Sequence, residues 1–337
     1  MVNFDPNIPN LIALSMGLLA ASMWGSWFIT LKHMGDYPLE AFYLTLFLTS
    51  MGVVWGIGFL LDGNQLVVNI KDIWAQDPSR IYVTFICGII YVVGIQLTLY
   101  VMQILGLTIT QPVQASVNVI AGTAISGLIG GVPPELTTGR IITAVVFLLL
   151  AVIVSMLAGR IRNVSQMSAN IITGLSRDPR DITRAVILLV ISSAFIPAYT
   201  LGLSYGLRSI TQPAGLAPMP FMAVLCTGAF TGALLFCGSA LSIRKQWGVF
   251  RKFGFNIHRL GMIAGFAHYG GNIIHTFATR NLSSVVSWPL GITAGLWTQM
   301  WGLVYGEFKG SPKKAYVLLG LGVIFYIIGA SIISNII

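Results

Sequence analysis

The chain has 337 residues, of which 55% are hydrophobic and 9% are charged, and its formal net charge is +9. Soluble domains carry about 25% charged residues, so this composition excludes a water-soluble globular enzyme and a disordered chain. No dense stripe of Lys and Arg carries the basic excess, and we therefore expect no nucleic-acid partner. A lipid bilayer is the expected surrounding of the chain.

Apolar runs long enough to cross a bilayer recur along the whole sequence. A helix needs about 20 apolar residues to span the hydrocarbon core. Ten such runs occur, at residues 11–32, 38–61, 81–104, 107–130, 139–159, 183–207, 217–241, 258–279, 283–306 and 315–336. We therefore predict an all-α polytopic membrane protein with ten transmembrane helices. Residues 62–80 are polar enough for a loop or a short interfacial helix, and tight hairpins are expected near Gly106 and near Arg280 and Asn281.

The N-terminus and the cysteines suggest neither processing nor a cofactor. The first ten residues lack Lys and Arg, so the first apolar run is expected to remain as a spanning helix and not to act as a signal peptide. Cys87, Cys226 and Cys237 are odd in number and lack zinc-ligand spacing. We expect no disulfide, no metal and no cofactor.

Basic residues fall mainly in one set of the segments between the runs. The segments that follow runs two, four, six and eight, together with the termini, hold five of the 19 Lys and Arg residues, and the other segments hold fourteen. Basic segments stay in the cytoplasm. We therefore expect the plasma (inner) membrane, with both termini extracytoplasmic.

Residues 160–182 are a basic segment between two five-run halves, 1–159 and 183–337. Because five is odd, related halves would lie in the membrane in opposite orientations, as in the inverted repeats of many secondary transporters. Sliding the chain by 177 residues aligns Gly25 with Gly202, Gly88 with Gly265, Gly94 with Gly271, and Pro112 with Pro289. We predict two inverted five-helix repeats joined by a cytoplasmic loop.

Polar residues within the eighth run share one helix face. His268, Asn272 and His275 are spaced i, i+4 and i+7. Intramembrane histidines commonly face the bundle interior or a wet cavity. Because histidine titrates near neutral pH, His268 and His275 are candidates for proton coupling as well as for solute binding. The alternative is that the three side chains only hold helices together.

Amides and aromatic rings in other runs are further candidates for solute binding. Amides both donate and accept hydrogen bonds, which suits a neutral polar ligand, and rings suit the apolar face of a sugar or a planar heterocycle. For the amides a role in helix–helix contacts is the alternative, and for the tryptophans a place at the membrane interface. The candidates are Gln111, Gln114, Asn118, Trp24, Trp27, Tyr91, Tyr199 and Trp288.

No Asp or Glu occurs at the middle of a run, so a strongly ionic solute would lack a compensating buried charge. This favours a neutral polar solute. Glu307 closes the ninth run beside Lys309 and is a candidate for a gate. The sequence contains no HExxH motif and no nucleophile–His–Asp set, so we do not expect an enzyme.

Short motifs resemble the drug/metabolite transporter superfamily. Gly306-Glu307, followed by three glycines in the last run, is similar to that superfamily's C-terminal pattern. Within it, three motifs are most similar to the glucose-uptake, rhamnose–proton symporter and ureide permease group: Trp24-Gly25-Ser26, Gly270-Gly271-Asn272 and Ser287-Trp288-Pro289-Leu290-Gly291. The first half departs from the pattern, because residues 130–135 contain no Gly-Glu pair.

The resemblance implies alternating-access transport of a small polar solute, often coupled to protons, through a central cavity lined by runs one, three, four, six, eight and nine. Together with the residues, it favours secondary-active transport of a sugar by a monomer or a homodimer. A permease for nucleobases, ureides or another metabolite is the main alternative. A passive channel is a further one, because neutral pores also use amides and small residues.

Overall fold

The computed structural model describes residues 4–105, 107–167 and 179–334, without the side chains at 99, 102–105, 107–113, 163–167 and 179–182. The described chain is helical and contains no strand. The hairpin predicted near Gly106 and the middle of the 160–182 segment lie outside these residues. In the first half the helices are α1 (Asn10–Ser26), η1 (Trp27–His33), α2 (Leu39–Asp62), α3 (Gln65–Gln76), α4 (Pro78–Leu105), α5 (Leu107–Ile129) and α6 (Thr138–Met167).

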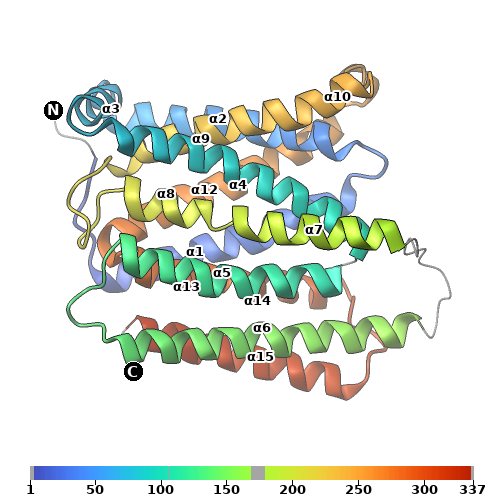
Figure 1. Cartoon of the computed structure of the whole chain (residues 1–337). Helices are drawn as coiled ribbons and strands as arrows, with labels where there is room; N and C mark the ends of the chain where they lie inside the picture. The colour runs from blue at the N-terminus through green and yellow to red at the C-terminus, as the bar shows by residue number, and fades with distance from the viewer. Residues whose placement is uncertain (1–3, 106, 168–178, 335–337) are drawn as a thin grey trace.

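The second half continues with the same kind of element. Its helices are α7 (Pro179–Phe195), α8 (Ala198–Gly206), α9 (Pro218–Ala233), η2 (Leu234–Gly238), α10 (Ser239–Ile243), α11 (Val249–Lys252), α12 (Phe255–Leu282), α13 (Ser284–Ile292), α14 (Ala294–Val304) and α15 (Lys313–Ile333). Figure 1 shows the long helices side by side along one common direction, with α3 seen nearly end-on. α1 begins and α15 ends at the same end of this bundle, which we call the terminal end.

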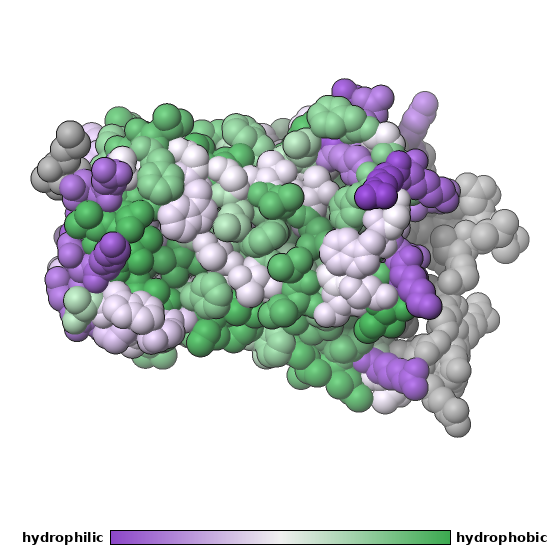
Figure 2. Space-filling model, turned by 90° about the horizontal axis from the view of Figure 1, so that it is seen from above, coloured by the Kyte–Doolittle hydropathy of each residue, from purple (hydrophilic) through white to green (hydrophobic). Residues whose placement is uncertain are grey.

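Length and composition make this chain an all-α membrane protein. Seven helical segments of the described residues are long and apolar enough to cross a membrane: Asn10–His33, Leu39–Asp62, Pro78–Thr98, Thr138–Arg162, Thr183–Gly206, Pro218–Ile243 and Lys313–Ile333. Leu60 and Leu128 are 85% and 87% exposed, which a water-facing surface would not favour. Figure 2 shows hydrophobic residues around the middle of the bundle and hydrophilic residues at its two ends.

Four of the predicted runs change their helical geometry inside the bundle. Run one passes from α-helix to 3₁₀-helix at Trp27, and run seven contains the π-helical turn η2. Run six is interrupted between α7 and α8 at Ile196 and Pro197. Run nine contains Pro289, but its interruption is at Thr293, between α13 and α14. Such irregular turns free backbone groups and often mark functional positions.

The polar stretch 62–80 contains the short amphipathic helix α3, the second of the two forms predicted for it. The turn after α12 is tight, as the sequence indicated, and lies two residues after Asn281. Only Ser283 separates α12 from α13, and its φ of 71° is unusual for a residue other than glycine.

The packing partners of the two halves correspond to one another. α4 packs on α9, and α12 packs on α2. α4 also packs on α7 and α8, whereas α12 packs on α1. α6 and α15 pack on each other at one side of the bundle, and α2 packs on α9 at the other (Figure 1).

Glycines allow the closest of these approaches. A Cβ at Gly88 would overlap backbone of α9, and a Cβ at Gly265 would overlap the carbonyl oxygen of Leu46 in α2. Small residues let helix backbones approach closely, which is how helices associate in lipid. α4 and α12 therefore each depend on a glycine where they pack on α9 and α2.

We expect Gly265→Ala to lower stability by about 1–3 kcal/mol, because the added methyl group forces α12 away from α2. Thermal unfolding of the purified protein in detergent measures this. Gly56→Ala in α2 is the matched control, since a Cβ there meets no atom within 4 Å. An unfolding midpoint for Gly265→Ala equal to that of the wild type would contradict this packing.

Candidate functional site

The polar face of α12 is buried in the middle of the bundle. His268, Asn272 and His275 are 5%, 1% and 0% exposed. The helical period places them on one face, and that face meets α1, α2 and α13. Polar groups without water must find partners in the protein or in a ligand. The neighbours of these three side chains therefore define the candidate site.

Both ring nitrogens of His275 have partners. Its Nε2 lies 3.0 Å from the carbonyl oxygen of Ser287, and its Nδ1 lies 3.3 Å from the hydroxyl of Tyr199. A carbonyl oxygen can only accept, so Nε2 carries the proton and donates it. Nδ1 then accepts from the Tyr199 hydroxyl. The imidazole is thereby fixed in one tautomer and one orientation between α8 and α13.

Trp24 closes the space beside this imidazole. Its Nε1 donates to Oδ1 of Asn272 at 2.7 Å, and its ring centroid lies 4.8 Å from that of His275. Gly291 makes the position possible, because a Cβ there would lie 2.5 Å from the Trp24 ring. The indole is therefore held by one hydrogen bond and by packing on two helices.

Trp288 of α13 lies on the other side of Tyr199. The two ring centroids are 5.9 Å apart, and Nε1 of Trp288 donates to the backbone oxygen of Asn118 at 3.1 Å. A Cβ at Gly122 of α5 would overlap the Trp288 indole. Glycine therefore lets α5 and α13 approach each other across this ring.

Tyr91 and His268 meet where the two halves meet. The Tyr91 hydroxyl lies 3.5 Å from Nε2 of His268, and the Tyr91 ring packs on Tyr199 with centroids 5.3 Å apart. Tyr91 and His268 are separated by 177 residues, which is the shift that aligns the halves in sequence. The ring of Trp27 lies nearly perpendicular to that of His268, with centroids 5.4 Å apart.

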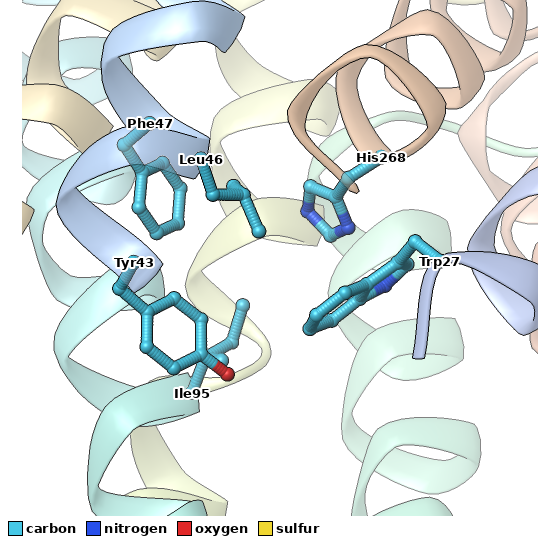
Figure 3. Close-up of a pocket in the computed structure, with 6 residues that line it drawn as sticks. All are labelled: Trp27, Tyr43, Leu46, Phe47, Ile95 and His268. Atoms are coloured by element: carbon cyan, nitrogen blue, oxygen red, sulfur yellow. The ribbon is translucent and has the colours of Figure 1, made fainter. Parts of the chain in front are cut away.

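A small pocket opens next to His268 (Figure 3). α2 contributes one wall, and Trp27 and His268 face it from the other side. The space is too narrow to admit a water molecule. Its lining consists of Trp27, Tyr43, Leu46, Phe47, Ile95 and His268.

Several buried polar atoms in this region have no hydrogen-bond partner within the described residues. They include Nδ1 of His268, Nδ2 of Asn272, Oδ1 of Asn118 and the hydroxyl of Tyr43 in the pocket wall. Native proteins seldom leave such atoms buried and unpaired, so each one requires an explanation. A ligand that donates and accepts hydrogen bonds would satisfy them. We refer to Trp24, Trp27, Tyr91, Asn118, Tyr199, His268, Asn272, His275 and Trp288 as the central cluster.

The central cluster contains nine of the eleven residues that the sequence suggested for solute binding. Gln114 is elsewhere: its amide donates to Thr98 at 2.5 Å and to Ser192 at 2.9 Å, and so joins α5 to α4 and α7. The side chain of Gln111 lies outside the described residues. The sequence analysis did not select the α2 residues Tyr43, Leu46 and Phe47, although a tyrosine within an apolar run was a usable signal.

Ion pairs occupy the two ends of the bundle. Glu307 pairs with Lys32, and its Oε2 lies 2.6 Å from Nη1 of Arg162, at the end opposite the termini. At the terminal end, Asp5 pairs with Arg208 and, at 2.7 Å, with Arg280. Each carboxylate joins cations from two separate helices or loops. The candidate gate residue therefore has a counterpart at the opposite end.

The arrangement provides binding groups and no evident metal site. In the part of the chain that the structure describes, no three His, Cys, Asp or Glu residues are grouped closely enough to hold a metal ion. The central cluster itself has no Asp, Glu, Lys or Arg, so its chemistry is that of rings, amides and neutral imidazoles. Such groups recognise hydrogen-bonding and apolar surfaces of a neutral molecule.

Comparison with known proteins supports the fold and does not indicate a function. No protein-family model matches the chain, and no curated protein matches it significantly. A crystal structure described only as that of a protein is similar to it, with a TM-score of 0.60 and 13% sequence identity, over 96% of this chain and 96% of that chain. At that identity the likeness supports a shared fold and carries no statement about the solute.

We expect Gln114→Leu to lower stability by about 1–3 kcal/mol, because two buried hydrogen bonds between helices are lost. Thermal unfolding measures the loss, and near-ultraviolet circular dichroism of the tryptophans should remain unchanged, since no ring of the central cluster contacts Gln114. Gln76→Leu, at an exposed position of α3, is the control. An unaltered unfolding midpoint for Gln114→Leu would show that the amide does not join the helices.

Proposed function

We propose that the chain is a secondary-active transporter that carries a small neutral polar solute, favouring a sugar, by alternating access. The observation that carries the proposal is the set of unpartnered polar atoms of His268, Asn272 and Asn118 among aromatic rings at the centre of a membrane protein. Polar side chains buried inside a membrane protein commonly line the pathway of a solute, because burying them without partners lowers stability.

The proposal includes ten spanning segments in two inverted repeats. α5, α12 and the pair α13–α14 would complete the seven segments defined by length and composition. The exchanged packing partners of α4 and α12 support the repeat, as does the contact between Tyr91 and His268. Inverted repeats commonly bind their solute near the membrane midplane, at the repeat interface. The central cluster would have that location.

Charge supports an orientation. The end opposite the termini holds Lys32, Arg162, Arg244 and Lys309, among others. Because basic loops remain inside, this end would be cytoplasmic and both termini extracytoplasmic. The membrane would be the plasma (inner) membrane.

The chemistry of the central cluster suits a neutral solute. Nδ2 of Asn272 is a donor, Oδ1 of Asn118 is an acceptor, and the ring of Trp24 offers an apolar face. A sugar ring presents hydroxyls at its edge and C–H groups on its face, which matches this set. Nucleobases and ureides present donors and acceptors in a plane and form the alternative solute class. The resemblance to the glucose-uptake, rhamnose–proton symporter and ureide permease group includes both classes.

Alternating access would move the two repeats about the central cluster. The narrow pocket beside His268 would widen to admit the solute as the repeats move. Glu307 would serve as the gate at the cytoplasmic end, and Asp5 as its counterpart outside. His268 and His275 would couple the movement to protons, since they are the only ionisable side chains other than tyrosine in the central cluster.

We expect His268→Phe and Asn272→Ala to weaken solute affinity by about 3- to 10-fold each, because each removes one hydrogen bond to the solute. The measurement is uptake of radiolabelled glucose, rhamnose, xylose, uracil or allantoin into proteoliposomes. Gln114→Leu is the control: it is expected to be less stable and yet to retain the affinity. Unchanged affinity in both site variants would show that the solute binds elsewhere.

The same uptake assay separates the alternatives. Uptake by a carrier saturates and is inhibited by unlabelled analogues, whereas flux linear in concentration and insensitive to analogues would contradict a carrier. An imposed pH gradient is expected to change the rate in the wild type and to have a smaller effect in His268→Phe, which retains His275. A wild-type rate that ignores the gradient would remove proton coupling from the proposal.

We expect Glu307→Gln to loosen the cytoplasmic end. Both ion pairs are lost, although the pair with Lys32 is partly exposed and contributes little. Amide hydrogen exchange in residues 27–33 and 305–312 should accelerate severalfold. Glu135→Gln, an exposed carboxylate at the terminal end, is the control. Equal exchange in Glu307→Gln and the wild type would exclude a gate at this carboxylate.

A further inference from the structure

A strongly basic surface covers the segment 243–259, between the end of α10 and the first turn of α12. The segment contains no Asp or Glu. Its five cationic residues are all exposed: Arg244, Lys245, Arg251, Lys252 and Arg259. Arg244 is neutralised by Glu40 at 2.7 Å. The other four have no carboxylate within ion-pair distance among the described residues.

Large apolar side chains are interleaved with these cations. Ile243, Trp247 and Phe255 are 82%, 44% and 69% exposed. Because α9 and α12 lie in the membrane, the segment that joins them lies at the boundary between hydrocarbon and water. A tryptophan, a phenylalanine and an isoleucine beside unpaired cations are typical of a surface that inserts rings among lipid headgroups.

The surface is held in place by His258 of α12. Its Nε2 lies 3.2 Å from the carbonyl oxygen of Phe250 and 3.1 Å from that of Phe253, and its Nδ1 lies 3.0 Å from the hydroxyl of Tyr37. Nε2 therefore donates, and Nδ1 accepts from the tyrosine. These contacts join α11 to α12 and to the start of α2. A preformed surface loses little conformational entropy on binding.

We infer that the 243–259 segment is a binding surface for anionic phospholipid headgroups in the membrane leaflet at this end of the bundle. The phosphate of such a lipid would pair with Lys245, Arg251 and Lys252 while its acyl chains lie along the exposed apolar side chains. Clusters of basic residues directly beside spanning helices bind anionic lipids, with about 1 kcal/mol from each Lys or Arg. The surface does not depend on the proposed transport and would bind lipid whatever the solute is.

The test uses the full-length protein purified in a neutral detergent. Binding of dioleoyl phosphatidylglycerol is measured by native mass spectrometry and compared with binding of dioleoyl phosphatidylcholine. We expect tighter binding of phosphatidylglycerol, and at least about a tenfold loss of its affinity in the triple variant Lys245→Gln, Arg251→Gln, Lys252→Gln. The charge-preserving variant Lys245→Arg, Arg251→Lys, Lys252→Arg should retain the affinity, and unfolding midpoints confirm that both variants fold.

A matched variant separates a specific surface from the general charge of this end. Lys309, Lys313 and Lys314 are exposed at the same end, and replacing all three with Gln should change the affinity less than about twofold. Equal losses in the two triple variants, an unchanged affinity in the first, or equal binding of phosphatidylcholine would overturn the inference. Displacement of the bound lipid by millimolar inorganic phosphate would also overturn it, by showing that free phosphate suffices.

Discussion

The burial of a polar helix face inside an apolar bundle is the constraint on which the rest of this structure depends. The α12 face with His268, Asn272 and His275 has no water to bond to, so neighbouring helices must supply partners or leave atoms for a ligand. Ser287 and Tyr199 satisfy His275 completely, and Trp24 satisfies half of the Asn272 amide. Hydrogen bonds within the protein therefore satisfy both ring nitrogens of His275, whereas Nδ1 of His268 is left without a partner.

His275 and His268 differ in how completely their ring nitrogens are hydrogen-bonded, and this difference indicates different roles for the two histidines. His275 has a fixed tautomer and orients the rings around it, whereas His268 has a nitrogen directed at no partner and lines the narrow pocket. Aromatic rings pack around both, tilted or edge-on in the cases of Trp24 and Trp27, and nearly parallel in that of Tyr91 against His268. Because Gly291 and Gly122 have no side chain, the rings of Trp24 and Trp288 can pack directly against the backbone at these positions. Binding groups and supporting groups are thus mixed on the same helices.

Much of this site was predictable from spacing alone. The i, i+4, i+7 pattern in α12 predicted three polar side chains on one face, and all three are buried. Trp24 and Trp27, which lie past the middle of their run, contact them. The role of Gln114 was not predictable, because its partners Thr98 and Ser192 belong to other helices. The breaks at Trp27 and Thr293 were also missed, since hydropathy does not report helical geometry. The α2 wall of the pocket was missed because apolar residues there look like any lipid-facing run.

The central claim is that unpaired polar atoms of the central cluster bind a neutral solute, and thermal unfolding with a panel of solutes tests it most directly. A ligand that binds only the folded state raises the unfolding midpoint. We expect at least one hexose, deoxyhexose, pentose, nucleobase or ureide to raise the midpoint of the wild type by several degrees, and the same solute to have no effect on the double variant His268→Phe, Asn272→Ala. A shift of equal size in that variant, or none with any member of the panel in the wild type, would contradict the claim.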